Sequence, residues 1–144
     1  MYKRQLLHPV VHLHLFNSCG ELYLQKRPAW KDIQPGRWDT AVGGHVDWGE
    51  EPLAALRREV REEVGVTDFE PQHVLTYLFE SERERELVYV YKTVYDGPVV
   101  PSGELDGGRF WTLREIAEGV GGGIFTPNFE GEIRRVAELP DVGR

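Results

Sequence analysis

The sequence has only one cysteine among its 144 residues, Cys19, so it cannot form an internal disulfide. A single cysteine fits a reducing compartment, and its place before a glycine in a turn does not indicate a nucleophile. The sequence also lacks any long apolar run, and no hydrophobic stretch follows the few basic residues at the N-terminus. It therefore predicts neither a signal peptide nor a membrane span, and the cytoplasm is the expected location.

Positive charge is scarce as well. There are 17 Lys and Arg residues against 24 Asp and Glu residues, a formal net charge of −7. Such a balance argues against a nucleic-acid-binding protein, which needs a basic face for the phosphate backbone. It leaves room for a small anionic substrate whose charge is offset by a bound metal ion. No glycine-rich nucleotide-binding pattern of the GxGxxG or P-loop kind occurs.

No internal repeat, low-complexity tract or linker divides the chain. A chain of this length buries roughly 70% of its unfolded surface, so one domain spanning residues 1–144 is expected. Apolar and polar residues alternate along 6–16, which predicts a strand with one apolar face, and a turn leads into a partner strand. The other predicted strands span residues 21–25, 38–42, 70–80, 86–95 and 108–111.

Three helices are predicted between and after these strands. The clearest spans roughly 51–64, because Pro52 suits a first helical position and Gly65 a C-terminal cap. Its buried stripe is predicted to contain Leu53, Leu56, Val60 and Val64. A capping box opens a short helix after Thr112, and Thr126 begins a last helix that runs up to Pro140. Strands interleaved with helices predict a mixed sheet between helices.

Three glutamates on the first helix, Glu59, Glu62 and Glu63, fall within an arc of about 100°. One interpretation is a solvated face on which Arg58 and Arg61 neutralise the acids. The other is a divalent cation between the carboxylates, and Mg²⁺ or Mn²⁺ accepts such oxygen ligands. The second interpretation explains the clustering better, because Glu59 and Glu63 repel each other one turn apart.

Residues 44–66 resemble the signature of the Nudix hydrolases and match all of its fixed positions: Gly44, Glu50, Arg58, Glu59, Val60, Glu62, Glu63, Gly65 and Val66. This resemblance implies the Nudix α/β/α sandwich and a loop–helix–loop that binds divalent metal. It also implies hydrolysis of a phosphoanhydride, usually in a nucleoside diphosphate linked to another moiety.

Carried over residue by residue, the resemblance implies metal binding by Glu59, Glu62, Glu63 and the carbonyl of Gly43. It implies a salt bridge between Glu50 and Arg58 that steadies the loop against the helix. A carboxylate must also accept the proton of the attacking water. Glu59, Glu62 and Glu86 all qualify, and the sequence does not choose among them.

Cations and aromatic residues flank this motif. Lys26, Arg27 and Arg37 border a loop that either steers phosphates or is a solvated connection. The aromatic residues nearby either stack on a substrate base or belong to the core; they are Trp30, Trp38, Tyr77 and Phe79.

Beyond the signature, stretches such as 7–17, 25–27 and 35–38 resemble isopentenyl-diphosphate isomerases and the hydrolases related to them. The match implies a second metal site that would suit Zn²⁺ or Mn²⁺. Its ligands would be His8, His45, Glu84 and Glu86. The isomerases carry a catalytic cysteine where this chain has Gly43, and this departure favours hydrolysis. An isomerase or a non-catalytic nucleotide-binding module are the alternatives, and monomer or homodimer is left open.

Overall fold

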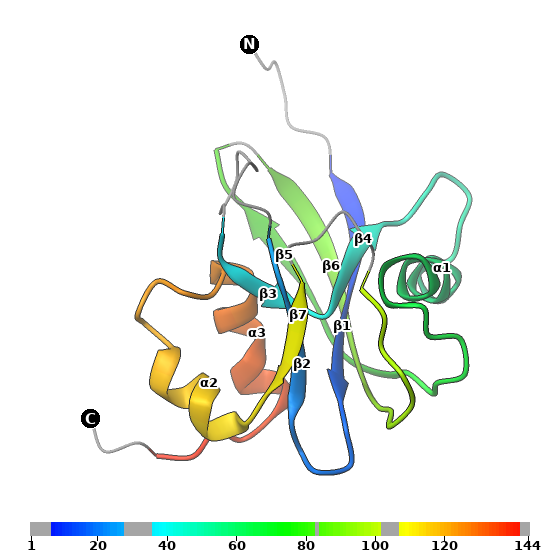
Figure 1. Ribbon diagram of the computed structural model, residues 1–144. Coiled ribbons are helices and arrows are strands. Elements are labelled where there is room, and N and C mark those ends of the chain that lie inside the picture. The colour runs from blue at the N-terminus through cyan, green and yellow to red at the C-terminus, as the bar shows by residue number, and fades with distance from the viewer. Residues whose placement is uncertain (1–6, 28–35, 83, 102–106, 142–144) are drawn as a thin grey trace.

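The computed structural model describes residues 7–27, 36–82, 84–101 and 107–141, which form seven strands and three helices (Figure 1). The strands are β1 (His8–Phe16), β2 (Leu22–Lys26), β3 (Trp38–Thr40), β4 (Val42–His45), β5 (Gln72–Glu80), β6 (Arg85–Val94) and β7 (Gly108–Trp111). The helices are α1 (Pro52–Val64), α2 (Leu113–Gly119) and α3 (Pro127–Val136).

All seven strands belong to one sheet, in which β1 is central. β1 runs parallel to β6 and antiparallel to β2 and β4. β5 pairs with β6, whereas β3 and β7 pair with β2. Figure 1 shows α1 on one side of the sheet and α2 with α3 on the other. The predicted mixed sheet between helices is therefore confirmed.

The segment predicted as one strand over 38–42 is divided at Ala41. β3 pairs with β2 through Trp38, whereas β4 pairs with β1 through Val42. The prediction was wrong here because the chain changes partner strand at this point. The change leaves β4 paired with β1 alone among the described strands.

Helix α1 packs on the β1 face that the sequence predicts to be apolar. Val11, Leu13 and Leu15 of β1 are fully buried there. The buried residues of α1 are Ala55, Leu56, Val60 and Val64. Leu53 was wrongly predicted to be buried: it is 43% exposed, because it lies in the first turn, before the first buried residue.

The opposite face of the sheet is covered by α2 and α3. The predicted capping box of Thr112 and Glu115 is present, and Thr126 caps α3 by accepting a hydrogen bond from the N–H of Phe129. Helix α3 ends at Val136, short of the predicted end at Pro140, because Ala137 is already extended. Fully buried aromatic side chains, Phe125 and Phe129, fill this layer.

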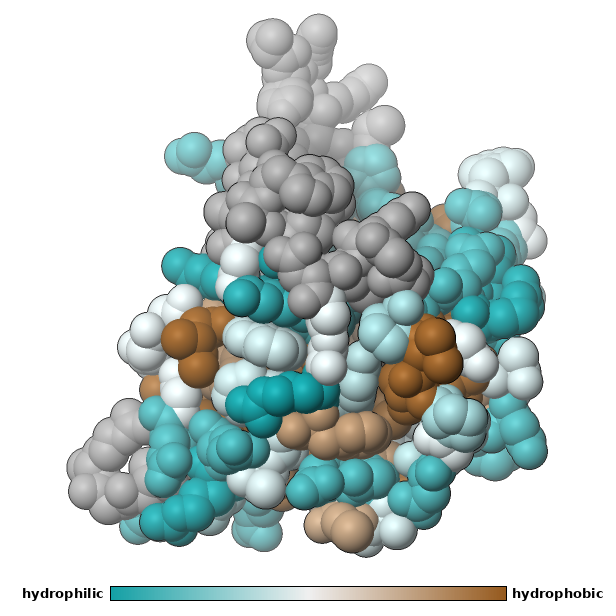
Figure 2. Space-filling model, in the orientation of Figure 1, coloured by the Kyte–Doolittle hydropathy of each residue, from teal (hydrophilic) through white to brown (hydrophobic). Residues whose placement is uncertain are grey.

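No helix within the described ranges is long and apolar enough to cross a membrane. Figure 2 shows one face of the molecule, with hydrophilic side chains gathered over α1 and hydrophobic ones in separate patches. Helix α1 carries the three predicted metal-binding carboxylates, Glu59, Glu62 and Glu63.

Candidate active site

Arg58 on α1 connects the helix to the loop before it. Its Nε donates to Oε2 of Glu50 at 3.0 Å, and its Nη2 donates to Oε1 of Glu50 at 2.9 Å. Nη2 also donates to the carbonyl of His45 at 3.0 Å, and Nη1 donates to Glu59 at 3.0 Å. The predicted pair is thus a two-point contact, and hydrogen bonds from Arg58 hold the pKa of Glu50 down to about 2.

Glu63 occupies the inner side of the helix, where its carboxyl hydrogen-bonds Glu59. Gln25 of β2 donates to Glu63 at 3.3 Å and to the carbonyl of Ala41 at 2.9 Å. Burial and the neighbouring Glu59 raise the pKa of Glu63 to about 8. Two carboxyl groups held this close cannot both ionise at low cost, which is the situation that a bound cation relieves.

The third predicted ligand, Glu62, is more exposed. Its side chain is 54% accessible, and its Oε1 lies 3.7 Å from Nη1 of Arg58. Among the described residues, no three His, Cys, Asp or Glu side chains are arranged to hold a metal ion as they stand. The structure thus brings Glu59 and Glu63 together and leaves Glu62 beside Arg58.

The adjacent glycines of β4 face opposite sides of the sheet. A methyl group added at Gly44 would overlap the Glu59 side chain on the α1 side. A methyl group added at Gly43 would lie 3.3 Å from Cδ2 of His12 on the α3 side. The two missing side chains let Glu59 and His12 pack directly against the β4 backbone from its two faces.

The predicted phosphate-binding residues have protein partners. Nη1 of Arg27 lies 3.6 Å from Oδ2 of Asp39, and Nη1 of Arg37 donates to the carbonyl of Phe125 at 3.4 Å. Lys26 ends β2 and is half-buried. Most of the loop that they flank, residues 28–35 with Trp30, lies outside the described residues.

The other three candidate stacking aromatics belong to the protein interior. Trp38 packs edge-on against Trp111, with ring centroids 5.2 Å apart. Phe79 packs against a buried cluster on the α3 side of the sheet, and Tyr77 contacts both that cluster and Glu132. Their side chains therefore have structural partners in this state.

Three of the four residues predicted as a second metal site lie in strands, and Glu84 directly precedes β6. The rings of His8 and His45 are 6.3 Å apart between centroids. His8 is in register with Glu86 across the parallel β1–β6 pair. Burial and the nearby charge of Glu84 raise the pKa of Glu86, while His8 and His45 oppose this rise. The four residues are neighbours without forming a metal-ready cluster.

A group that the sequence analysis missed is buried beneath α3. Glu132 is 2% exposed and accepts hydrogen bonds from His12 at 2.7 Å, His14 at 2.8 Å and Tyr77 at 2.6 Å. Burial would lower the pKa of His12, but the charge and hydrogen bond of Glu132 prevail and raise it to about 9. The sequence feature that could have revealed this buried group is a glutamate within the apolar stripe of the last helix, beside Ile133.

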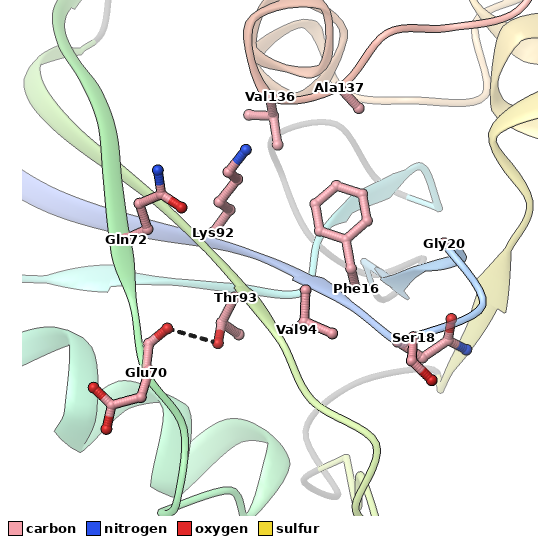
Figure 3. Close-up of a pocket in the computed structure, with 11 residues that line it drawn as sticks. Phe16, Ser18, Gly20, Glu70, Gln72, Lys92, Thr93, Val94, Val136 and Ala137 are labelled. Carbon is pink, nitrogen blue, oxygen red and sulfur yellow. Dashed lines mark hydrogen bonds between the residues drawn. The ribbon is translucent and has the colours of Figure 1, made fainter.

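A cavity of about 750 Å³ lies at the other end of β1 (Figure 3). Phe16, Val94 and Val136 form apolar parts of its lining, and the side chain of Lys92 extends toward Val136. None of the described residues that line it belongs to the predicted site. The carboxylates on α1 and this cavity are therefore separate features.

The fold and the carboxylate-bearing helix define a recognisable class of protein. A model of the NUDIX domain family matches residues 6–129. The chain belongs to the Nudix family, whose hydrolase members bind small-molecule diphosphate substrates and generally use a divalent metal such as Mg²⁺. Family membership and the hydrolase relatives together support a pyrophosphohydrolase.

An isopentenyl-diphosphate Delta-isomerase of Serratia proteamaculans is 30% identical over an alignment of 123 residues, which covers 82% of this chain and 67% of that protein. An uncharacterized Nudix hydrolase of Pseudomonas aeruginosa is 36% identical over 97 residues, which are 67% of this chain and 57% of that protein. The matched region thus covers less than two thirds of the Pseudomonas protein. The MutT protein of Methanosarcina mazei has the same fold, with a TM-score of 0.78 at 24% identity, over 93% of this chain and 95% of that one.

Proposed function

We propose that this chain is a metal-dependent pyrophosphohydrolase that cleaves a phosphoanhydride bond in a nucleoside diphosphate linked to another moiety, or in a similar diphosphate. The observation that carries the proposal is the Glu59–Glu63 contact on α1. Burial and the neighbouring carboxylate hold a proton on Glu63 near neutral pH, where a divalent cation would take its place. A cytoplasmic location is part of the proposal, because the single cysteine fits a reducing compartment.

The donor set suits Mg²⁺ or Mn²⁺, because it consists of oxygens. Glu59, Glu62 and Glu63 with the carbonyl of Gly43 would hold the ion, Glu62 turning inward from its exposed position. The ion would supply neutralisation of charge on the pyrophosphate oxygens and acidify a bound water. Arg58 keeps α1 and the preceding loop in a fixed relation through its two bonds to Glu50.

Three carboxylates are candidates for the proton acceptor, and their surroundings differ. Glu59 and Glu62 both lie within 4 Å of Nη1 of Arg58, at 3.0 and 3.7 Å. Glu86 has no such arginine partner within the part of the chain that the structure describes, and burial and the charge of Glu84 raise its pKa. A raised pKa favours proton acceptance by a carboxylate, so we rank Glu86 first, provided that it is not itself a ligand of a second ion. Its position on the other face of the sheet requires the attacked phosphate to reach that face.

Lys26, Arg27 and Arg37 are proposed to bind the substrate phosphates. The 3.6 Å ion pair of Arg27 and the 3.4 Å hydrogen bond of Arg37 are long and only partly buried, which is compatible with this role. We further propose that His8, His45, Glu84 and Glu86 bind Zn²⁺ or Mn²⁺ as a second ion. The support is the register of His8 with Glu86 and the 6.3 Å separation of the His8 and His45 ring centroids.

Isomerisation of isopentenyl diphosphate is the second candidate, because one relative that matches 82% of this chain is an isomerase. Gly43 argues against it, since this position has no side chain to move a proton. A non-catalytic nucleotide-binding module is the third candidate. It would bind nucleotide with metal and release no product.

The test is a panel of nucleotide sugars, dinucleotides, deoxynucleoside triphosphates and prenyl diphosphates, each with Mg²⁺ or Mn²⁺ and with product identification by mass. Hydrolysis at a phosphoanhydride that stops on chelation supports the proposal. Solvent proton exchange into isopentenyl diphosphate without phosphate release would identify the isomerase. Binding without turnover across the panel would reject both enzymatic candidates.

A further inference from the structure

Gln25 of β2 connects the carboxylates of α1 to the sheet. Its Nε2 donates to the carbonyl of Ala41 at 2.9 Å and to Oε1 of Glu63 at 3.3 Å. A backbone carbonyl only accepts hydrogen bonds, so the contact with Ala41 decides which end of the amide faces it. Gln25 therefore presents a donor to Glu63, and an amide keeps its protons throughout the working pH range.

The backbone around Gln25 is held on both sides. Strand β2 pairs with β3 and with β7, and Gln25 is in register with Asp39 of the first and Gly108 of the second. Its side chain is enclosed as well, because the residue is only 7% exposed. A packed side chain on a strand with two neighbours can hold another group in a defined place.

A purely structural role explains only part of this arrangement. Ala41 is fully buried at the change of strand between β3 and β4, and Gln25 supplies the donor that its carbonyl needs. The amide oxygen of Gln25, however, is buried without a hydrogen-bond partner among the described residues. An unsatisfied buried oxygen is costly, and the bond to Ala41 alone leaves this cost unexplained.

The second partner, Glu63, is held by the sheet, whereas the neighbouring Glu59 is held by its own helix. Besides the amide of Gln25, the backbone N–H of Gly43 hydrogen-bonds Glu63. Both of these donors belong to strands, β2 and β4. Glu59 instead accepts from Arg58, the preceding residue of α1. Glu63 is therefore the carboxylate of the pair whose place is set by the sheet.

We propose that Gln25 is a positioning residue, whose amide fixes the Glu63 carboxylate against the sheet so that it is in place before a divalent ion binds. The inference rests on the proposed function, because it takes Glu63 as a metal ligand. Removing a hydrogen-bond partner of a metal ligand typically changes metal affinity by roughly 10- to 100-fold. A ligand that is already in place also loses less conformational freedom when the ion arrives.

The deciding variant is Gln25→Met, which keeps the length of the side chain and removes the amide. Mn²⁺ alone is titrated into the substrate-free protein, and the unbound Mn²⁺ is measured from its EPR signal. The Kd for Mn²⁺ should rise roughly 10-fold or more. Adding Gln25→Met to Glu63→Gln should weaken Mn²⁺ binding little further, because Gln25 acts through Glu63.

Thr93→Val is the matched control. Thr93 is 4% exposed, and its hydroxyl donates to the carbonyl of Glu70 at 2.9 Å, in the lining of the cavity in Figure 3. The variant therefore loses a buried bond from a side chain to a backbone carbonyl, as Gln25→Met does, but outside the proposed site. Both variants should melt at a lower temperature than the parent, and only Gln25→Met should bind Mn²⁺ more weakly. An equal rise of Kd in both, or a parental Kd in Gln25→Met, would overturn the inference.

A measurement on the parent protein decides the matter if Gln25→Met does not fold. The side-chain amide of Gln25 has its own signals in a proton–nitrogen NMR spectrum. Mg²⁺ should shift these signals in the parent, because the charge and contacts of Glu63 change when the ion binds, and should leave them in place in Glu63→Gln. The absence of a shift in the parent at high Mg²⁺ would overturn the inference.

These readouts do not depend on turnover. If Gln25→Met weakens Mn²⁺ binding and the parent hydrolyses no panel substrate, the hydrolase assignment fails and the inference is kept. If the parent hydrolyses a substrate and Gln25→Met binds Mn²⁺ as tightly as the parent, the inference fails and the hydrolase assignment is kept. A parent protein that binds no Mn²⁺ would overturn both.

Discussion

Arg58 donates hydrogen bonds to both carboxylate oxygens of Glu50, from Nε to Oε2 at 3.0 Å and from Nη2 to Oε1 at 2.9 Å. The two residues are eight apart in the sequence and stand on either side of the α1 N-terminus. The same guanidinium donates to Glu59 and to the carbonyl of His45. One side chain therefore ties together the loop, the end of β4 and a proposed metal ligand.

Glu50→Gln should lower turnover at least about 10-fold, because an amide cannot accept both hydrogen bonds and the loop loses its fixed place. Melting temperature should fall slightly at neutral pH. The difference in melting temperature between parent and variant should vanish near pH 2. A carboxyl group whose pKa is lowered in the folded state stabilises the fold above its unfolded-state pKa, and this stabilisation is lost as the pH falls through the folded-state pKa. Glu51→Gln is the control, because the Glu51 side chain makes no capping hydrogen bond. Equal losses in both variants would contradict the assignment.

Glu63→Gln should lower metal-dependent turnover by at least about 100-fold and leave the melting temperature of the metal-free protein within a few degrees. The raised pKa gives the sign of the pH effect. A carboxyl that binds its proton more tightly when folded destabilises the fold as pH rises from about 4.5 through about 8. The metal-free parent should therefore lose stability over this range relative to the variant. Unchanged metal-dependent hydrolysis by the variant would contradict the assignment of Glu63 as a metal ligand. The control is Glu118→Gln on α2, which removes the same charge outside the proposed site.

Gly44→Ala should abolish most activity and retain the fold. The added methyl group would overlap the Glu59 side chain, whose flexible end can move aside at the cost of its position. Gly131→Ala on α3 is the matched control, because no heavy atom lies within 4 Å of its added carbon. It should be fully active and more stable by about 0.5–1 kcal/mol, the usual gain for alanine inside a helix. Both variants are compared by steady-state turnover and thermal unfolding.

The His12–Glu132 pair should make stability depend on pH in a defined window. His12 has a raised pKa, so its contribution to folding stability is complete below about pH 6.5 and is lost as the pH rises through about 9. Glu132 has a lowered pKa because His12 and His14 outweigh its burial, so its contribution is complete above about 4.5. The parent should exceed Glu132→Gln in melting temperature most clearly between these limits. A difference that does not change from pH 5 to pH 9.5 would contradict this account.

Much of the fold follows from local patterns. Alternation in 6–16 predicted β1 and its apolar face, and threonines at 112 and 126 predicted the helix starts, because these signals act between residues close in sequence. The wrong predictions concern features that depend on contacts between elements that are distant in the sequence. Leu53 fits the helical stripe but is 43% exposed in the first turn of α1, and the chain changes partner strand at Ala41.

The candidate site divides in the same way. The sequence alone determined the carboxylate spacing on α1, since the helical period places Glu59, Glu62 and Glu63 on one side wherever the helix lies. Only the tertiary structure decided that Glu59 and Glu63 touch while Glu62 turns toward Arg58. It alone decided that Glu132 meets His12, 120 residues away. A residue period describes one element, whereas the packing of α3 on the sheet depends on all the elements between them.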